Sequence, residues 1–438
     1  MRCPIPSRAG RVPFEPYPLF SSFSNAAIEQ SRNGTRREVT SFRPDENFTN
    51  VAGWNRRLGA LPLSNISASG ATARTFAVRA GGFFPQWKTD RTAYPLGYMA
   101  ALDGARGLMT LGVLLAHARM ALFQGAAVYM DVFFAMSGYL ITSLLIADYQ
   151  KRGHISLKKF YVRRFLRLYP ALATMIILFV IICWFFSNDF QSRLTEAAVT
   201  FFYLMDYWRP FVGTGVYYTG HTWSLAVEEQ FYLLWPLMFI VLLRIMGLSS
   251  TTAVAIFGLA ALFWAWRIWL TANGSEISRL YDCLDTRADA LLIGCALAVS
   301  LKVIDLSKHP KFATFCARAL LPMAAGGLAM GFLMDPQFRW YYYVSPLFGA
   351  IPGAILIVGL LQPQRTIMHQ VYEHPIPVFC GRICYGLYIW HFPIFAWVAS
   401  WATPRYLMTF LIGWPLTFAV SIASYYLIER HFMRARPV

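Results

Sequence analysis

Charged side chains are scarce in this sequence. Asp, Glu, Lys and Arg together make up 14% of its 438 residues, whereas 57% are hydrophobic and 16% are aromatic. An ordinary soluble domain carries about 25% charged residues, so this composition argues against a water-soluble globular protein of this length. The chain is expected to be embedded in a membrane.

Acidic residues are the scarcer kind, with 22 Asp and Glu against 39 Lys and Arg, and the net charge is +17. Such a charge is also typical of nucleic-acid-binding proteins. Here the basic residues lie mainly between long apolar runs and in the N-terminal stretch, not along an amphipathic surface. Loops that face anionic lipid explain the charge better, and no nucleic-acid partner is expected.

Paired cysteines are also lacking. The sequence has seven cysteines, and none shows the paired spacing of a disulfide framework, a zinc site or a haem site. We therefore expect no bound metal and no permanently bound cofactor. The cysteines that lie in or beside apolar segments are Cys183, Cys295, Cys316, Cys380 and Cys384.

Residues 1–98 differ from the rest of the chain. They contain twelve Arg, one Lys, many Ser, Pro and Asn, and no apolar run long enough to span a bilayer. This composition predicts a disordered basic extension before a membrane domain at 99–438. Two other interpretations stay open: an organellar transit peptide, which the six acidic residues disfavour, and a start-site artefact with Met99 as the true initiator.

Apolar stretches that are long enough to cross a bilayer, or nearly so, recur from Leu102 onward. A further stretch, 194–207, is only about fourteen residues long and contains Glu196 and Asp206, so it suits a re-entrant or interfacial helix. The expected fold is all-α, a polytopic transmembrane helical bundle of about ten spans. These spans are 104–124, 128–147, 168–187, 222–246, 250–271, 285–304, 317–334, 342–361, 379–401 and 406–428.

The charge bias between the spans predicts their orientation. The loop from Lys151 to Arg167 carries seven Lys and Arg residues, so the positive-inside rule places it in the cytosol. If 194–207 does not cross, the basic clusters at 302–311 and 430–436 are also cytosolic, and if it crosses, both lie outside. We therefore expect both termini in the cytosol, in a multi-pass protein of the cell (inner) membrane.

The first expected span carries candidate catalytic residues. Arg106 and His117 are eleven residues apart, about 1100° on a helix, so they share one face about 16 Å apart along the axis. A guanidinium can clamp phosphates of a CoA-sized ligand, and a neutral imidazole, oriented by Glu228 or Asp131, can act as general base. The spacing is equally consistent with a structural role, in which Arg106 pairs with Asp103 and His117 bonds a neighbouring helix.

Three arginines precede the third span. Arg163 and Arg167 lie one helical turn apart, with Arg164 between them. Such a cluster can bind the phosphates of CoA. Taken alone, it is better explained as topogenic charge that contacts lipid headgroups.

Polar residues of another kind open three spans on the opposite side. Asp131 opens the second span, Trp223 and Glu228 lie at the start of the fourth, and Arg287 and Asp289 open the sixth. Carboxylates and aromatic rings at one mouth can bind a sugar through hydroxyl hydrogen bonds and ring stacking.

A structural interpretation competes at the same positions. Arg287 can pair with Asp285 or Asp289, and Trp223 can belong to the interfacial aromatic belt, which is the favoured role for Trp223. In the ninth span, His391 lies near mid-membrane and is either a second catalytic group or an architectural polar residue, with the architectural role favoured.

The order and spacing of these residues, from about 99 to 431, resemble the acyltransferase-3 family of integral membrane acyltransferases. Members of this family O-acylate polysaccharides, lipopolysaccharide, peptidoglycan, macrolides and other acceptors. The resemblance rests on Leu102-Asp103-Gly104, Arg106-Gly107 with His117, Asp131-Val132-Phe133-Phe134 with Ser137-Gly138, Arg163-Arg164 and Arg167 with Pro170, Trp223-Ser224-Leu225 with Glu228, Arg287 with Asp289, and Tyr385 with Tyr388 and His391.

The resemblance implies an acyl-CoA co-substrate, with acetyl as the expected group, and a catalytic Arg–His pair. The expected acceptor is a carbohydrate or glycolipid hydroxyl, as in exopolysaccharide or lipopolysaccharide. The candidate site residues are His117, Arg106 and Glu228 for catalysis, Arg163, Arg164 and Arg167 for the donor, and Asp131, Trp223, Arg287, Asp289, Tyr388 and His391 for the acceptor.

One departure from the family and one rival function remain. The family often ends its last span with Glu, a basic residue and Pro, whereas here His431 follows Glu429 and Arg430. A transporter or flippase of lipid-linked sugars would also suit ten spans with intramembrane charges. The sequence disfavours it, because it shows no inverted repeat and no matched pair of broken helices.

The orientation gives a first testable prediction. A topology reporter fused after Pro437 should read as cytosolic, because the C-terminal basic cluster follows the positive-inside rule only when 194–207 stays on one side. A reporter at this position that reads as extracytoplasmic would contradict the ten-span arrangement.

Overall fold

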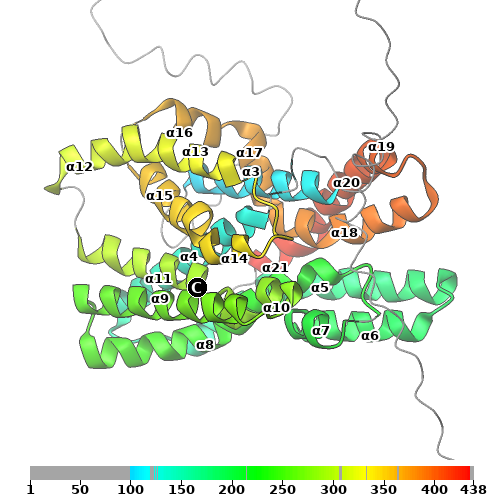
Figure 1. Ribbon diagram of the computed structural model, residues 1–438, viewed down its shortest axis with the longest axis horizontal. Helices are drawn as coiled ribbons and strands as arrows, with labels where there is room; N and C mark the ends of the chain where they lie inside the picture. The colour runs from blue at the N-terminus through cyan, green and yellow to red at the C-terminus, as the bar shows by residue number, and fades with distance from the viewer. Residues whose placement is uncertain are drawn as a thin grey trace, which may run out of the picture. The chain divides into compact units, whose positions relative to one another are not determined.

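The computed structural model describes residues 99–118, 123, 125, 127–213, 215–304, 308–331, 333–362 and 365–434. Over these residues it contains helices and no strand, which confirms the predicted all-α class (Figure 1). The expectations for residues 1–98 lie outside the described residues. The longer helices are α3 (Ala100–His117), α4 (Val128–Arg152), α5 (Leu157–Phe186), α6 (Phe190–Phe201), α8 (Trp223–Met246), α9 (Ser250–Ala272), α11 (Ala288–Val303), α13 (Leu321–Gly331), α15 (Ala350–Leu360), α18 (Cys384–Trp401) and α20 (Trp414–Ser424).

Shorter helical segments connect or extend these helices. Three π-helical stretches continue a neighbouring helix, and a single 3₁₀ turn precedes α8 and another precedes α11. The short α-helices are α7 (Met205–Phe211), α10 (Ile277–Asp282), α12 (Pro310–Phe315), α14 (Trp340–Phe348), α16 (Ile367–Tyr372), α17 (Pro375–Arg382), α19 (Arg405–Met408) and α21 (Arg430–Arg434), and the other segments are η3 (Gly220–Thr222), η4 (Leu284–Thr286), η6 (Cys316–Leu320), η7 (Thr409–Gly413) and η8 (Tyr425–Glu429).

The chain is a multi-pass integral membrane protein. Seven helical segments of the described part are long and apolar enough to cross a membrane, and α17 with α18, bent by 74°, makes an eighth if the two form one span. The ten expected segments are reached only by adding α3 and α11. Helix α3 is not apolar enough to count as a span, because it carries Asp103, Arg106 and His117. Helix α11 is too short, because it has only 16 residues.

Segment 194–207 does not form a spanning helix. Helix α6 has 12 residues, or about 18 Å, against a hydrocarbon core of about 30 Å. It ends at Phe201, Tyr203 takes a left-handed conformation with φ 53°, and α7 starts at Met205. The length is that predicted for an interfacial or re-entrant segment.

Glycine allows α4 and α11 to pack backbone against backbone. A Cβ at Gly138 would lie 1.9 Å from the carbonyl oxygen of Leu291, and a Cβ at Gly294 would lie 1.9 Å from that of Ala135. Small residues at such crossings are how helices approach closely in a bilayer. Helix α9 packs on another side of α11, so α11 is enclosed between its neighbours.

Helix α3 is held in the same way against α17. A Cβ at Gly107 would lie 2.0 Å from the carbonyl oxygen of Pro377, and a Cβ at Gly381 would lie 1.8 Å from that of Asp103. Because the two backbones touch at two successive turns, the position of α3 in the bundle is set along its axis.

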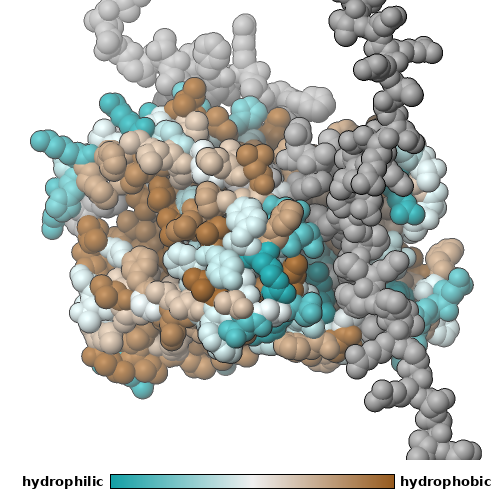
Figure 2. Space-filling view, viewed as in Figure 1, coloured by the Kyte–Doolittle hydropathy of each residue, from teal (hydrophilic) through white to brown (hydrophobic). Residues whose placement is uncertain are grey.

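Apolar side chains cover much of the outside of the bundle. Figure 2 shows hydrophobic surface over the region of α8 and α9, where Leu233, Val254 and Leu262 are each at least half exposed. On α5, Phe185 and Phe186 are exposed as well. Such surfaces are stable against lipid tails and not in water.

The α4–α11 contact gives a second prediction. Gly294→Leu should lower the melting temperature of the purified protein in detergent sharply, because overpacking costs about 1–3 kcal/mol and here the clash is with a carbonyl that cannot move alone. Gly258→Leu in α9 is the matched control, since no atom lies within 4 Å of its added Cβ. Equal melting temperatures for the two variants would contradict the close contact.

Candidate active site

Two histidines from distant parts of the chain meet at the end of α3. The Nδ1 of His117 lies 2.9 Å from the Nε2 of His391 in α18, and the two rings are nearly parallel, at 21°, with centroids 5.0 Å apart. The Nδ1 of His391 lies 2.7 Å from the carbonyl oxygen of Tyr388 and 3.1 Å from that of Leu387. His391 is fully buried, so it presents no surface to a substrate, whereas His117 is partly exposed. A partly exposed imidazole held in this way can accept and release a proton at a fixed place.

The carboxylates that were expected to orient His117 lie elsewhere. Among the described residues, the hydrogen bond of His117 goes to His391 and not to Glu228 or Asp131. Glu228 accepts a hydrogen bond of 2.5 Å from Ser137, and Asp131 forms an ion pair. The prediction that one of them positions His117 is wrong in geometry, because a buried carboxylate takes the partners that neutralise or solvate it.

A third histidine, His221, completes a cluster of imidazoles, and sequence reasoning gave it no role. It lies in η3, and its ring stacks on Phe392 at 4.9 Å and lies 5.1 Å from the ring of His391. The side chain is 3% exposed, and within the described residues neither ring nitrogen has a partner with full hydrogen-bond geometry, although the backbone of Tyr388 and Ile389 lies close to the ring. A histidine directly before an apolar span was the available signal.

Tyr388 joins α18 to the start of α8. Its hydroxyl donates a hydrogen bond of 2.7 Å to the backbone carbonyl of His221 and lies 2.6 Å from the hydroxyl of Ser224. Tyr388 was expected to bind the acceptor. In the structure its hydroxyl is used by the protein itself, where it fixes the distance between the histidine-bearing elements.

Arginines gather near the opposite end of α3. The guanidinium of Arg106 is within electrostatic reach of Asp103 and Glu228, and that of Arg164 lies 3.6 Å above the ring of Tyr232. The Nε of Arg164 is buried and has no hydrogen-bond partner in the described part of the chain. Arg106 and Glu228 thus belong to this cluster, and His117 lies at the other end of the helix.

Sequence reasoning missed one member of the arginine cluster, and one expected member lies apart from it. Arg167 and Arg382, the last residue of α17, both act electrostatically on Asp103. Arg163 instead lies near Asp148 and Arg152. Neighbouring residues project about 100° apart on a helix, so Arg163 and Arg164 cannot share a face.

The carboxylates at the starts of α4 and α11 are used in buried ion pairs. Asp131 pairs with Arg287 at 2.9 Å, and Asp289 pairs with Arg267 at 2.6 Å, with all four side chains at most 2% exposed. The expected pairing of Arg287 with Asp285 or Asp289 is therefore wrong. Asp131 and Asp289 do not form an open mouth lined by carboxylates.

Trp223 lies in the core, not in a lipid-facing belt. It is 4% exposed, and its ring packs against Phe134 and lies 4.8 Å from the ring of Tyr281. The guanidinium of Arg287 lies 4.7 Å from the centre of Tyr281 and 5.8 Å from that of Trp223. The aromatic-belt interpretation is wrong, since these rings cover the Asp131–Arg287 pair.

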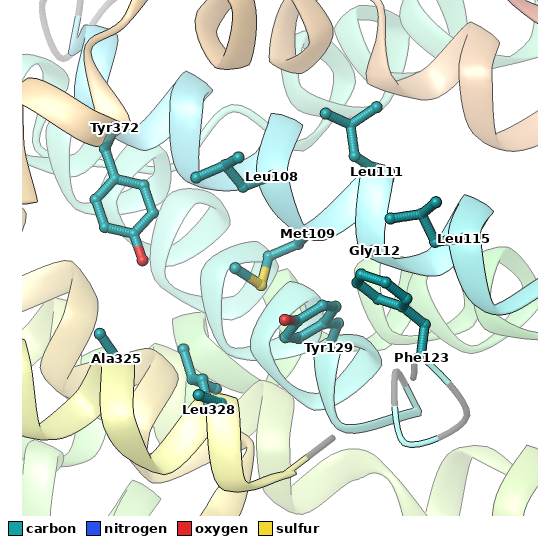
Figure 3. Close-up of a pocket in the computed structure, with 11 residues that line it drawn as sticks. Leu108, Met109, Leu111, Gly112, Leu115, Phe123, Tyr129, Ala325, Leu328 and Tyr372 are labelled. Carbon is teal, nitrogen blue, oxygen red and sulfur yellow. The ribbon is translucent and has the colours of Figure 1, made fainter. Parts of the chain in front are cut away.

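An apolar cavity of about 400 Å³ lies on the other side of α3. Figure 3 shows Met109, Leu115, Tyr129 and Tyr372 around it. Leu115 is nine residues beyond Arg106, about 180° around the helix, so the cavity faces away from the Arg106 and His117 side. Within the described residues, no three His, Cys, Asp or Glu side chains are arranged to hold a metal ion.

Comparison with known proteins gives a family match. Residues 99–428 match the model of a family described as an acyltransferase domain. No solved structure matches the chain.

Three curated relatives are similar over much of the chain. A peptidoglycan O-acetyltransferase, OatA, of Listeria monocytogenes is 32% identical over 318 residues, which cover 69% of this chain and 50% of that protein. A Staphylococcus aureus protein named as a candidate O-acetyltransferase is 28% identical over 77% of this chain and 58% of its own. A Bacillus subtilis protein named as a candidate peptidoglycan O-acetyltransferase is 31% identical over 68% and 48%. The chain thus spans about half the length of these relatives.

Proposed function

The chain belongs to the acyltransferase domain family, and from this membership we propose that it transfers an acetyl group from acetyl-CoA to a carbohydrate hydroxyl. The acceptor class comprises exopolysaccharide, lipopolysaccharide and, from the names of the relatives, peptidoglycan. The observation that carries the proposal is the placement of a partly exposed His117 and an arginine cluster at the two ends of one helix.

The arginine cluster is the proposed donor site. Arg106, Arg164 and Arg167 come from two helices, and Arg382 adds a fourth guanidinium from a third helix. Guanidinium groups bind phosphate oxygens with paired donors, and the 3′-phosphate and pyrophosphate of CoA carry several such oxygens. Glu228 lies within electrostatic reach of Arg106, Arg164 and Arg167, so it offsets part of their charge when no phosphate is bound.

His117 is the proposed general base. It removes the proton of the acceptor hydroxyl, whose oxygen attacks the thioester carbonyl carbon. The C–S bond then breaks, and the CoA thiolate takes the proton from the imidazolium. In the main variant of this scheme, His117 first accepts the acyl group and then passes it to the hydroxyl.

Replacing His117 tests the proposal. His117→Gln should lower acetyl transfer at least about 10²-fold while the protein still inserts and accumulates, because the base is lost but the helix is not. The assay is incorporation of label from [¹⁴C]acetyl-CoA into glycan by membrane vesicles of a deletion strain that carries the full-length variant. His154→Gln, at an exposed histidine, is the matched control.

The outcome also separates the enzyme from a transporter. Normal acetylation by His117→Gln would end the proposed role of His117. Absence of any labelled glycan with the wild-type protein, together with movement of a lipid-linked sugar across the vesicle membrane, would favour the transporter.

The two neighbouring arginines of α5 give a further prediction. Arg164→Met should raise the KM for acetyl-CoA about tenfold or more, because a hydrogen bond to a charged group is worth about 1.5–3 kcal/mol. Arg163→Met should leave the KM within about threefold, since Arg163 lies near Asp148 on another face. Equal effects from the two variants would mean that general surface charge, and not this cluster, attracts the donor.

A further inference from the structure

We propose that His391 fixes the tautomer of His117 and so acts as the positioning residue of the transfer reaction. This inference rests on the proposed function, because it concerns the same base. The two ring nitrogens of His391 face different kinds of atoms. One nitrogen faces backbone carbonyl oxygens and the other faces His117.

The proton of His391 must lie on Nδ1. This nitrogen is 2.7 Å from the carbonyl oxygen of Tyr388 and 3.1 Å from that of Leu387. Carbonyl oxygens only accept hydrogen bonds, so the ring nitrogen between them has to donate. A lone pair at this place would face two oxygen atoms in a buried setting, which is costly.

The proton of His117 follows from that of His391. A neutral imidazole carries one N–H, so the Nε2 of His391 holds a lone pair and accepts. The Nδ1 of His117, 2.9 Å away, is then the donor. The lone pair of His117 is left on its Nε2, for which no hydrogen bond is found among the described residues.

This arrangement makes the outer nitrogen of His117 the basic one. The residue is partly exposed, whereas His391 behind it is completely buried. The ring of His117 is also held by an edge contact of 5.2 Å with Phe392. Orientation and tautomer are therefore set together, as when a third group orients a catalytic histidine through its other nitrogen.

The same bond stabilises His117 after proton uptake. When Nε2 takes the acceptor proton, the Nδ1–H of the imidazolium donates a charge-assisted hydrogen bond to His391. The charge faces His391, whose own Nδ1–H points to two carbonyl dipoles. The proton later leaves from Nε2 to the CoA thiolate, so His391 gains and loses none over the cycle.

Two substitutions separate positioning from packing. His391→Phe keeps an aromatic ring beside His117 and removes the acceptor, whereas His391→Gln keeps an acceptor oxygen. We expect kcat to fall about 10²–10⁴-fold in His391→Phe, with the KM for acetyl-CoA within about threefold, because a wrong tautomer removes the base without touching the donor site. His391→Gln should retain kcat within about tenfold of the wild type. Trp397→Phe, on the exposed side of the same helix, is the control.

A spectroscopic signature is independent of activity. In full-length protein labelled with ¹⁵N-histidine and placed in lipid nanodiscs, His117 should carry its proton on Nδ1, the less common tautomer in free histidine. Its signals are identified by their loss in His117→Gln. In His391→Phe the protonated nitrogen of His117 should change to Nε2 or to a mixture.

Three results would overturn the inference. These are a kcat within threefold of the wild type in His391→Phe, a wild-type His117 protonated on Nε2, or equal losses in His391→Phe and His391→Gln. Failure of the proposed function looks different: His117→Gln itself then keeps normal transfer, whatever the tautomer. Loss of transfer in His117→Gln with full transfer in His391→Phe would refute only the role of His391.

Discussion

The arrangement of this bundle depends on backbone contacts that only glycine permits. In a bilayer, lipid tails are as apolar as leucine, so burying apolar side chains between helices gives little driving force and close packing has to hold them. Gly107 and Gly381 let α3 touch α17, and Gly138 and Gly294 let α4 touch α11. Because these contacts involve rigid carbonyl groups, α3 and α4 form a frame on which the polar residues are placed.

Buried ion pairs join further helices to this frame. An isolated charge in an apolar interior costs several kcal/mol, and pairing offsets that cost only when the geometry is good. Asp131 of α4 meets Arg287 beside α11, and Asp289 of α11 meets Arg267 of α9. Three of these residues, Asp131, Arg287 and Asp289, were expected to bind a sugar, and they instead form ion pairs that connect the helices. His117, the proposed base, takes part in neither ion pair.

The sequence predicts the structure reliably where the length of an apolar run or the helical period decides where a residue lies. Hydropathy located the apolar helices, of which seven or eight in the described part are able to cross a membrane, and a period of 3.6 residues placed Arg106 and His117 on one face of α3. Sequence reasoning failed for partners far apart in the chain, such as His117 with His391, because one sequence does not say which helices are neighbours. The different surroundings of Arg163 and Arg164 could have been predicted from the sequence. Helix α5 begins at Leu157, so both arginines lie on one helix, where neighbouring residues project about 100° apart.

Helix α3 is continuous from Ala100 to His117, and its backbone contacts that of α17 at Gly107 and Gly381. Its length between Arg106 and His117, about 16 Å, is therefore a fixed quantity of the molecule. In the proposed mechanism, phosphates bind at one end of α3 and the base lies at the other, so the length of α3 sets the distance that the donor has to span. A thioester on a short carrier without phosphates would reach the imidazole but lack an anchor, and a longer carrier would overshoot it. The protein would then select its donor by the distance between the phosphates and the thioester, and not by contacts with the acyl group.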